Sequence, residues 1–196
     1  MHYKNLISTE INEYIEDIAK LRIKIFHDYP YLYDGDLAYE RKYLQTYVNS
    51  KTSLVSLAMD GERLVGATSC IPMKDEWDDF KAPFIANNID PTQVFYFGES
   101  ILLPEYRGKG IGKEFFTIRE SHAKAHLPSL KYTAFCSVMR PKNHPLKPKD
   151  YRPLDAFWSK MAYQKQEDLQ AKTAWKDLDK TKEDTKSLVF WLKNWD

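Results

Sequence analysis

The sequence predicts an α/β fold with a mixed, mostly antiparallel central sheet flanked by helices. Three observations support this prediction. Two amphipathic helical patterns open the chain, a hairpin pattern surrounds Asp60-Gly61, and a later strand pattern runs through a glycine-rich turn directly into another helical pattern. Helical and strand patterns that follow one another in this way are typical of one sheet with helices packed on it.

The expected elements follow from local patterns. Apolar residues recur at helical spacing over residues 11–26 and 37–48, and Asp60-Gly61 is a strong short-range hairpin signal. Residues 73–90 are polar and partly helical in pattern. The other expected elements are a faint strand at 3–8, hairpin strands at 53–59 and 63–71, a central strand at 94–103, a helix from 111 to about 126, a strand at 131–138, a short helix at 154–161, and closing strands at 168–177 and 186–194.

Composition limits the possible functions. The 196 residues are 43% hydrophobic, enough for a substantial core, and we expect one domain over residues 1–196. The net charge of +1 gives no broad field for nucleic acid or an anionic membrane. Because the chain shows neither a long apolar run nor an apolar leader, we expect a cytoplasmic protein that does not bind membranes. Cys70 and Cys136 lie in apolar stretches and are expected to be reduced core residues.

The turn after the central strand carries the clearest functional signal. It consists of Arg107, Gly108, Lys109, Gly110, Ile111, Gly112 and Lys113. At a helix start the backbone N–H groups lack helical partners and the helix dipole is positive, so this turn predicts a diphosphate site. A Walker A loop would need glycine at position 107, and a Rossmann fingerprint would need glycine at position 113.

Arg107, Gly110 and Gly112 form the pattern Arg-x-x-Gly-x-Gly after a strand that ends in Leu102-Leu103-Pro104-Glu105. This pattern resembles motif A of the Gcn5-related N-acetyltransferases, the GNAT family, and the order of elements is similar to the family's over nearly the whole chain. The resemblance implies a GNAT-like acyl-CoA N-acyltransferase fold in which the turn binds the pyrophosphate of acetyl-CoA, the co-substrate. It also implies that Ile101, Leu102 and Leu103 hydrogen-bond the pantetheine arm, and no metal is expected.

The C-terminal part of the resemblance departs from the family at two positions. Residues 156–163 are similar to the family's Phe-Tyr-x-x-x-Gly-Phe ending, but Trp158 stands where many members carry the tyrosine that reprotonates the CoA thiolate. Ala162 replaces the usual glycine. An indole has no acidic proton to give, so the family's usual general acid does not carry over.

Glu99 is the expected catalytic and amine-binding residue. Strand alternation places Phe95, Phe97, Glu99, Ile101 and Leu103 on one face, so Glu99 is a carboxylate among apolar side chains. Such a group can accept a proton from an amine, directly or through water. The alternative is that Glu99 pairs with an arginine or backbone amides and only anchors the sheet. Gly98 marks either a bulge that splays the central strands or ordinary close packing.

The acceptor amine is expected at the loop between the first two helices. Tyr31, Tyr33 and Asp34 can bind a cation through ring faces and a carboxylate. Alternatively, these residues are a helix cap and core-facing tyrosines.

Residues 140–153 form a proline-rich loop that the resemblance places on the side where CoA and acceptor emerge. Tyr151 is the candidate proton donor for the departing thiolate, and His144 is a candidate proton shuttle. Solvated side chains are the alternative for both. His122 and His126, four apart on one helix, are better explained by packing and a helix-end cation than by metal binding.

Together these features predict an N-acetyltransferase that moves an acetyl group from acetyl-CoA to a primary amine of a small molecule or peptide by direct attack. The protein is expected to act as a monomer or homodimer. The alternative is a non-catalytic acyl-CoA-binding or sensor module. A nucleotide-phosphate-binding regulator is disfavoured by the excluded loop patterns.

Overall fold

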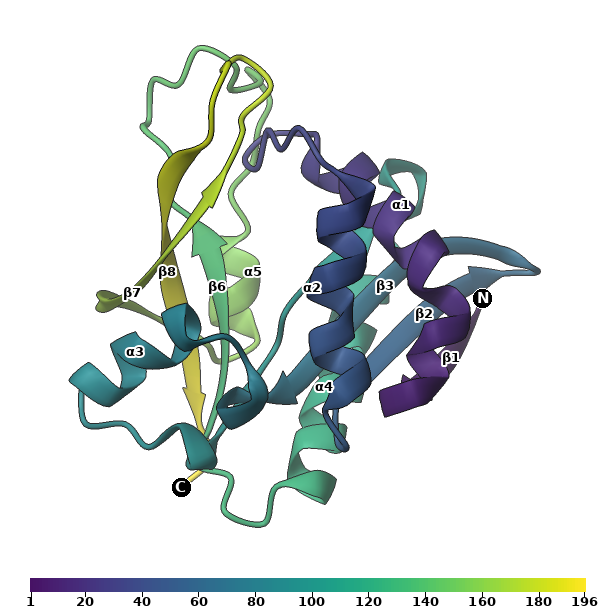
Figure 1. The fold of residues 1–196 in the computed structure, drawn as a ribbon, viewed down its shortest axis with the longest axis vertical. Coiled ribbons are helices and arrows are strands. Elements are labelled where there is room, and N and C mark those ends of the chain that lie inside the picture. The colour runs from purple at the N-terminus through teal and green to yellow at the C-terminus, as the bar shows by residue number, and fades with distance from the viewer.

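The computed structural model describes residues 1–196 and contains one eight-stranded sheet (Figure 1). Its strands are β1 (His2–Ile7), β2 (Leu54–Asp60), β3 (Arg63–Pro72), β4 (Val94–Tyr96), β5 (Ser100–Leu102), β6 (Tyr132–Val138), β7 (Gln164–Trp175) and β8 (Asp184–Asn194). Their order is β1-β2-β3-β4-β6-β8-β7, and β5 also pairs with β3. Only the β4–β6 pair is parallel, so the predicted mixed, mostly antiparallel sheet is confirmed.

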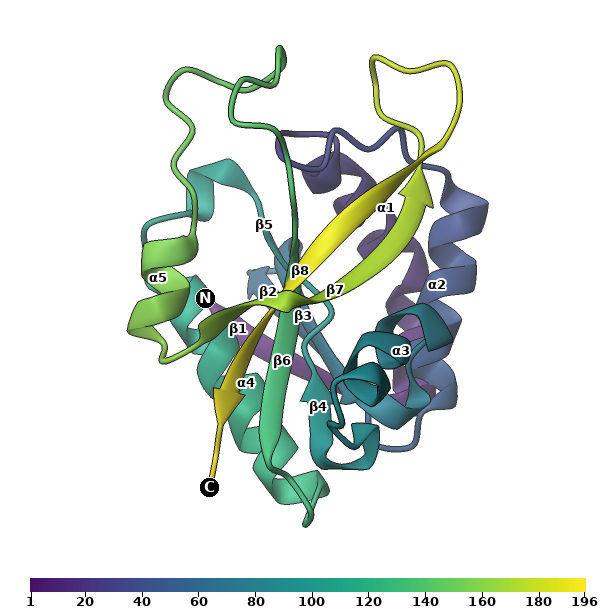
Figure 2. The same cartoon turned by 90° about the vertical axis from the view of Figure 1, so that its left-hand side faces the viewer.

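Helices cover both faces of the sheet. A 3₁₀ segment (Ser8–Tyr14), α1 (Ile15–Phe26), α2 (Leu37–Asn49) and α3 (Asp78–Ala86) lie on one side, and α4 (Ile111–His126) and α5 (Asp155–Lys160) lie on the other (Figure 2). The helices on each face bury apolar stripes: Ile18 of α1 has no exposed surface, and Phe115 of α4 is 1% exposed. None of the helices has the length and the apolar run that a membrane crossing requires.

Two apolar clusters form the core. The larger includes Ile18, Leu44 and Tyr96 and extends over α1, α2 and the neighbouring strands. The smaller is aromatic, with Phe97, Phe116 and other rings packed beside α4 and α5. The central strand therefore contributes alternate side chains to separate clusters.

The central strand is interrupted at residues 97–99, where a bulge at Gly98 was one of the two alternatives that the sequence left open. The pairing moves three residues along β3, from Ile71 to Thr68, but four along its partner, from Tyr96 to Ser100. One extra residue makes a β-bulge and reverses the alternation beyond it. The prediction that Phe97 and Glu99 share one face is therefore wrong: Phe97 packs against Phe116 of α4, whereas the Glu99 carboxylate bonds Arg22 of α1.

Gly98 lies in this bulge, where its amide donates to the Ser69 carbonyl at 3.1 Å. A Cβ at this position would lie 1.8 Å from Tyr47 Oη and 2.7 Å from Ser69 Oγ. Glycine is required here because the buried Tyr47 ring approaches the backbone so closely.

Candidate active site

The turn before α4 presents free backbone amides. Gly108 and Gly110 have φ angles of +75° and +86°, a conformation that strains residues with a Cβ, and Gly110 is the N-cap of the helix. The amides of Lys113 and Glu114 donate to the Gly110 carbonyl, whereas those of residues 108–112 donate to no protein acceptor. The free amides are therefore available to an anion.

The surroundings of this turn fit a diphosphate. A Cβ built at Gly108 or Gly110 would meet no atom within 4 Å, so the space beside the backbone is open to a ligand. Arg107, Lys109 and Lys113 are exposed around the turn. Arg107 Nε also donates to the Leu102 carbonyl at 3.2 Å, which fixes the turn to the end of β5.

One edge of β5 has no strand partner. The parallel β4–β6 ladder extends to Tyr96, and the Phe97 amide still donates to Ala134 at 2.7 Å, but β5 pairs only with β3. The Glu99 carbonyl and the Leu103 amide bond to β3. By alternation, Ser100 and Leu102 point their backbone groups to the open edge. Of the three residues predicted to hold pantetheine, Leu102 faces this edge and Ile101 and Leu103 face β3; Ser100, which was not among the three, also faces the open edge.

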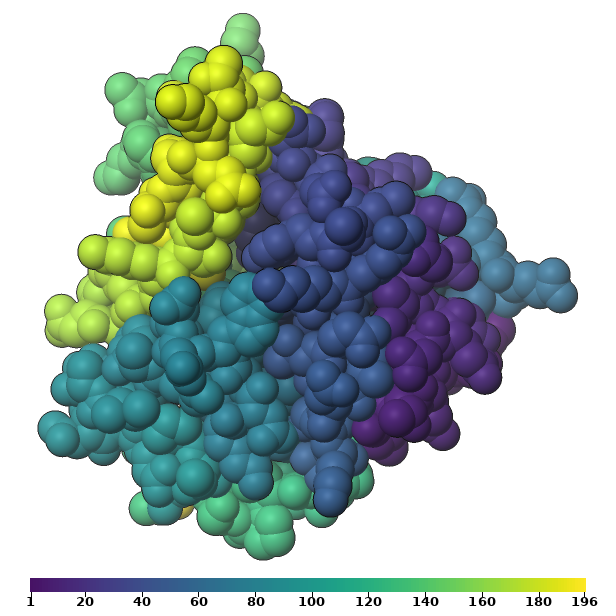
Figure 3. All heavy atoms as spheres, viewed as in Figure 1, coloured from purple at the N-terminus to yellow at the C-terminus, as the bar shows by residue number.

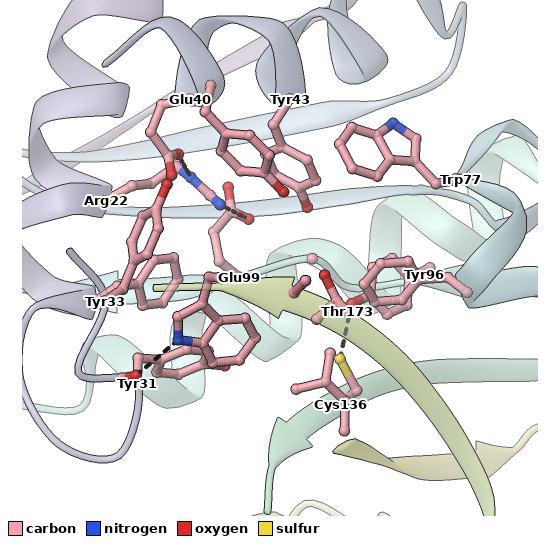
Figure 4. A pocket seen from close by; sticks show the side chains of 17 residues that line it. Arg22, Tyr31, Tyr33, Glu40, Tyr43, Trp77, Tyr96, Glu99, Cys136 and Thr173 are labelled. Carbon is pink, nitrogen blue, oxygen red and sulfur yellow. Dashed lines mark hydrogen bonds and ion pairs between the residues drawn. The ribbon is translucent and has the colours of Figure 1, made fainter. Parts of the chain in front are cut away.

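A cavity of about 110 Å³ lies between α1, α2, β6 and the β7–β8 hairpin (Figure 4). In Figure 3 the hairpin (yellow) meets α2 (blue) and α3 (teal) on the same face of the molecule. The cavity is lined by Arg22, Phe26, Tyr31, Tyr33, Tyr39, Glu40, Tyr43, Trp77, Phe80, Tyr96, Gly98, Glu99, Cys136, Thr173, Ala174, Trp175 and Leu188. We call this cavity the acceptor pocket.

A buried charge cluster forms one wall of the acceptor pocket. Arg22 Nε bonds Glu40 and Arg22 Nη1 bonds Glu99 Oε2, and Figure 4 shows the guanidinium between the two carboxylates. Burial alone would lower the pKa of Arg22, but the charges of Glu99 and Glu40 hold it well above its usual value. Glu99 Oε1, in contrast, is buried and has no hydrogen-bond partner. An unpaired buried oxygen of this kind is available to a donor that enters the pocket.

Arg22 and Glu40 were not predicted, although the sequence held a signal for both. Arg22 falls four residues after Ile18 on the apolar stripe of α1, and Glu40 falls four before Leu44 on that of α2. Charged residues at core positions need a buried partner. The alternative expectation from the sequence, that Glu99 pairs with an arginine, is thus observed for one of its two carboxylate oxygens.

A second arginine holds the bulge from the opposite face. Arg119 of α4 is buried, with its guanidinium over the rings of Phe97 and Phe116 at 4.4 and 4.7 Å. Its Nη1 donates to the Glu99 carbonyl at 3.4 Å, and Thr68 Oγ1 donates to the same oxygen at 2.8 Å. Glu99 is therefore fixed through both its backbone and its side chain.

Glu76 is a further buried carboxyl beside the acceptor pocket. Its Oε1 accepts a bond from the amide of Trp77, a pocket residue, at 3.1 Å, while Oε2 has no partner. Burial raises the pKa of Glu76 to about 7, and the charge of Glu99 adds to this effect.

The predicted acceptor residues are only partly brought together. Tyr31 and Tyr33 line the pocket with Glu99. Asp34 does not, because its carboxylate pairs with Lys176 at 2.5 Å outside the lining. Burial raises the pKa of Tyr31 and of Tyr33, so both hydroxyls stay protonated as hydrogen-bond donors.

Tyr151 lies outside the pocket lining. Its ring is edge-on to Tyr29 with centroids 4.6 Å apart, and the His144 ring lies 5.9 Å from Tyr29. Burial, followed by the neighbouring Tyr29, raises the pKa of Tyr151. Trp158 packs on Phe135, with centroids 5.1 Å apart, as part of the aromatic cluster.

The cysteines and histidines have packing roles. Neither cysteine forms a disulfide. Cys70 is buried in the core as expected, but Cys136 lines the pocket and shares a 3.1 Å hydrogen bond with the Tyr96 hydroxyl. His122 and His126 stack 4.0 Å apart and bond to backbone carbonyls, and no group of three His, Cys, Asp or Glu side chains is placed to hold a metal ion.

Arg140, which is half-buried, links the loop after α1 to the β7–β8 hairpin beside the pocket. Arg140 Nε donates to the Pro30 carbonyl at 2.7 Å and Nη2 donates to that of Tyr31, while the guanidinium pairs with Asp177 at 2.6 and 2.9 Å. Trp175 Nε1 also donates to the Tyr31 carbonyl at 3.1 Å. The loop after α1 is thereby fixed to the β7–β8 hairpin.

Free amides at the start of the helix that follows the central strand make a binding site for an anion such as a diphosphate. The family model described as "Acetyltransferase (GNAT) family" matches residues 15–147, more than half of the chain. The chain therefore belongs to the GNAT acetyltransferase family, as the sequence resemblance predicted.

Solved structures share the fold at low sequence identity. Arabidopsis thaliana NAA60 in complex with a bisubstrate analogue is 12% identical, with a TM-score of 0.61 and 100% of both chains covered. The ribosomal-protein-alanine N-acetyltransferase of Brucella melitensis is 11% identical, with a TM-score of 0.62 and 99% of each chain covered. Salmonella typhimurium yncA with its cofactor acetyl-CoA is 10% identical, with a TM-score of 0.58 and coverage of 100% of this chain and 95% of that one. No curated protein sequence matches the chain.

Proposed function

We propose that the protein is an acetyl-CoA-dependent N-acetyltransferase that acts on a primary amine by direct attack. The observation that carries this proposal is the free, buried Oε1 of Glu99, a residue that lines the acceptor pocket beside the open edge of β5. A hydrogen-bond acceptor at this point suits an amine that must lose a proton before it attacks.

Acetyl-CoA fits the other half of the site. The amides of residues 108–112 and the cations of Arg107, Lys109 and Lys113 would bind the pyrophosphate, with the backbone of Ile111 and Gly112 in the first turn of the helix. Leu102 would hydrogen-bond the pantetheine arm along the open edge of β5, which ends at the bulge that contains Glu99.

The proposed reaction uses one residue of the acceptor pocket and one residue outside its lining. Glu99 accepts a proton from the amine, whose nitrogen bonds to the thioester carbonyl carbon as the carbon–sulfur bond breaks. Tyr151 is proposed to give its proton to the departing thiolate. Its place against Tyr29, next to the loop that carries Tyr31, supports this role.

The direct test is an assay of free thiol in mixtures of the protein, acetyl-CoA and a panel of primary amines. Thiol release that depends on the amine, with a matching acetylated product by mass spectrometry, supports the proposal. Saturable binding of acetyl-CoA with no release for any amine would leave the non-catalytic acyl-CoA-binding or sensor module as the function.

Glu99→Gln tests the proton acceptor. The amide keeps the shape but cannot take the proton, so kcat should fall by about 10²- to 10⁴-fold and one limb of the pH–rate profile should disappear, with affinity for CoA unchanged. Glu40→Gln is the matched control, because it removes the other carboxylate partner of Arg22 but leaves Glu99 intact. Equal losses in the two variants would assign Glu99 to the ion pair alone.

Tyr151→Phe tests the proton donor. We expect kcat to fall by on the order of 10-fold or more. The loss should be greatest for acetyl thioesters whose thiolate is a poor leaving group. Tyr29→Phe removes the hydroxyl of the ring beside it and should leave kcat near the wild-type value. A Tyr151→Phe enzyme with wild-type kcat would remove Tyr151 from the mechanism.

A further inference from the structure

We infer that the acceptor is a compact primary amine with an aromatic or similarly apolar body and no carboxylate beside the amine. This inference rests on the proposed function and names the substrate class of the same site. It follows from three properties of the acceptor pocket: its size, its walls and its charge.

The size of the pocket limits the acceptor. A volume of about 110 Å³ is several times the roughly 10–15 Å³ that a cavity needs to hold one water molecule. The acceptor pocket therefore has room for a small group such as one ring with its amine. A folded polypeptide segment or a large polycation would have to leave most of its atoms outside.

The walls of the pocket are apolar and largely aromatic. Twelve of its seventeen lining residues are hydrophobic. Tyr31 and Trp175 lie with ring centroids 6.0 Å apart on one side, and Tyr43 and Trp77 lie 5.7 Å apart on the other, as Figure 4 shows for the labelled residues. Aromatic side chains on two sides of the pocket favour a flat apolar body between them and a cation at its end.

The charge of the pocket selects against acids. Its lining holds two carboxylates, Glu40 and Glu99, and one cation, Arg22. The Arg22 guanidinium bonds both carboxylates, and its faces are covered by the rings of Tyr43 at 4.3 Å and Phe26 at 5.0 Å. A single ammonium balances the remaining negative charge, whereas a carboxylate on the acceptor would meet repulsion in a desolvated space.

Three ligands that share a phenyl ring and a primary amine separate these properties, and phenylalanine and its amide are matched in size. 2-Phenylethylamine has the proposed features, phenylalanine adds a carboxylate, and phenylalaninamide replaces that carboxylate with a neutral amide. An alanine-rich tripeptide with a free N-terminus represents peptide acceptors. Affinity is measured by calorimetry on protein saturated with CoA, and kcat/KM is measured by thiol release with saturating acetyl-CoA.

We expect phenylethylamine to bind about 10²-fold more tightly than phenylalanine, with the amide between them and the tripeptide weakest. Equal or tighter binding of phenylalanine would overturn the inference and show that Arg22 recognises a carboxylate. Tightest binding of the tripeptide would overturn it in favour of a peptide acceptor, and so would binding of none of the four. The expected binding order without turnover would support the substrate class but contradict the proposed N-acetyltransferase activity. Failure of the inference can therefore be distinguished from failure of the proposed function.

Glu40→Gln links the selectivity to the charge cluster. Loss of one negative charge should reduce the phenylethylamine-to-phenylalanine affinity ratio by about 10-fold. Glu62→Gln, an identical exchange in the exposed β2–β3 turn, is the control and should leave the ratio unchanged. A ratio that is unaltered in Glu40→Gln would contradict the electrostatic explanation.

Discussion

Gly98→Ala should destabilise the protein by about 2–4 kcal/mol. The added methyl group would lie 1.8 Å from Tyr47 Oη, and Tyr47 has no exposed surface into which it could move. Overpacking of a rigid core costs about 1–3 kcal/mol, and displacement of the Tyr47 hydroxyl also breaks its 3.0 Å hydrogen bond to Tyr43, a loss of about 1 kcal/mol. For a chain of this size the melting temperature should fall by about 5–15 °C.

The effect is measured by calorimetry and urea unfolding without CoA. Tyr47→Phe removes the atom that meets the new methyl group, so the double variant should recover part of the loss and reveal a coupling free energy of at least about 1 kcal/mol. Gly112→Ala is the matched control, since its Cβ would make an ordinary 3.6 Å contact with Phe157 and the helix should gain about 0.5–1 kcal/mol. A Gly98→Ala protein as stable as wild type, or no recovery with Tyr47→Phe, would refute the reasoning.

Three other substitutions test separate parts of the structure. Gly110→Glu should abolish CoA binding in calorimetry. Gly61, which also has a positive φ and no atom within 4 Å of an added Cβ, provides the control, and Gly61→Glu should bind CoA normally. Equal CoA affinities of the two variants would remove the turn from the cofactor site. The pKa of Glu76 is about 7 in the folded protein, against its usual 4.5. Because the folded state retains the proton that the unfolded state releases, the stability of the protein falls as the pH rises from about 4.5 to about 7. Glu76→Gln should therefore be up to roughly 3 kcal/mol more stable than wild type at pH 8 and no more stable at pH 4, as melting curves at the two pH values would show. Ala162→Gly should raise stability by about 0.5–1 kcal/mol, because Ala162 has a φ of +66° at the end of α5; a lower melting temperature would contradict this.

Local patterns predicted most of the fold. Gly61 turns the predicted hairpin with a φ of +59°, and α4 spans Ile111–His126 as its apolar stripe and preceding glycines indicated. Strand β7 begins at Gln164, four residues before its expected start, because its polar first residues pair with β8 without showing an apolar alternation. The sequence left open whether Gly98 marks a bulge or close packing, because the tyrosine that approaches its backbone lies about fifty residues earlier in the chain.

The candidate site was predictable only where it depends on short-range sequence. The turn around Gly110 carries its own backbone signal. Glu99 was selected as a carboxylate within an apolar strand pattern, and Tyr31 as an aromatic residue in the loop between the first two helices. Trp175 and Leu188 could not be assigned to the acceptor pocket, because nothing local specifies where the β7–β8 hairpin docks.

The Arg140 contacts also have a consequence for folding. They join the start of the proline-rich loop at residues 140–153 to the carbonyls of Pro30 and Tyr31, which lie 110 and 109 residues away in the sequence. Contacts of such high separation carry a large loop-closure entropy and tend to form late, after the local hairpins and helices. The turn at Gly110, whose elements are adjacent in sequence, can form before the acceptor pocket closes. Hydrogen exchange during refolding should therefore protect the amides of α4 before those of Asp34 and Leu178, which bond between the loop after α1 and the β7–β8 hairpin.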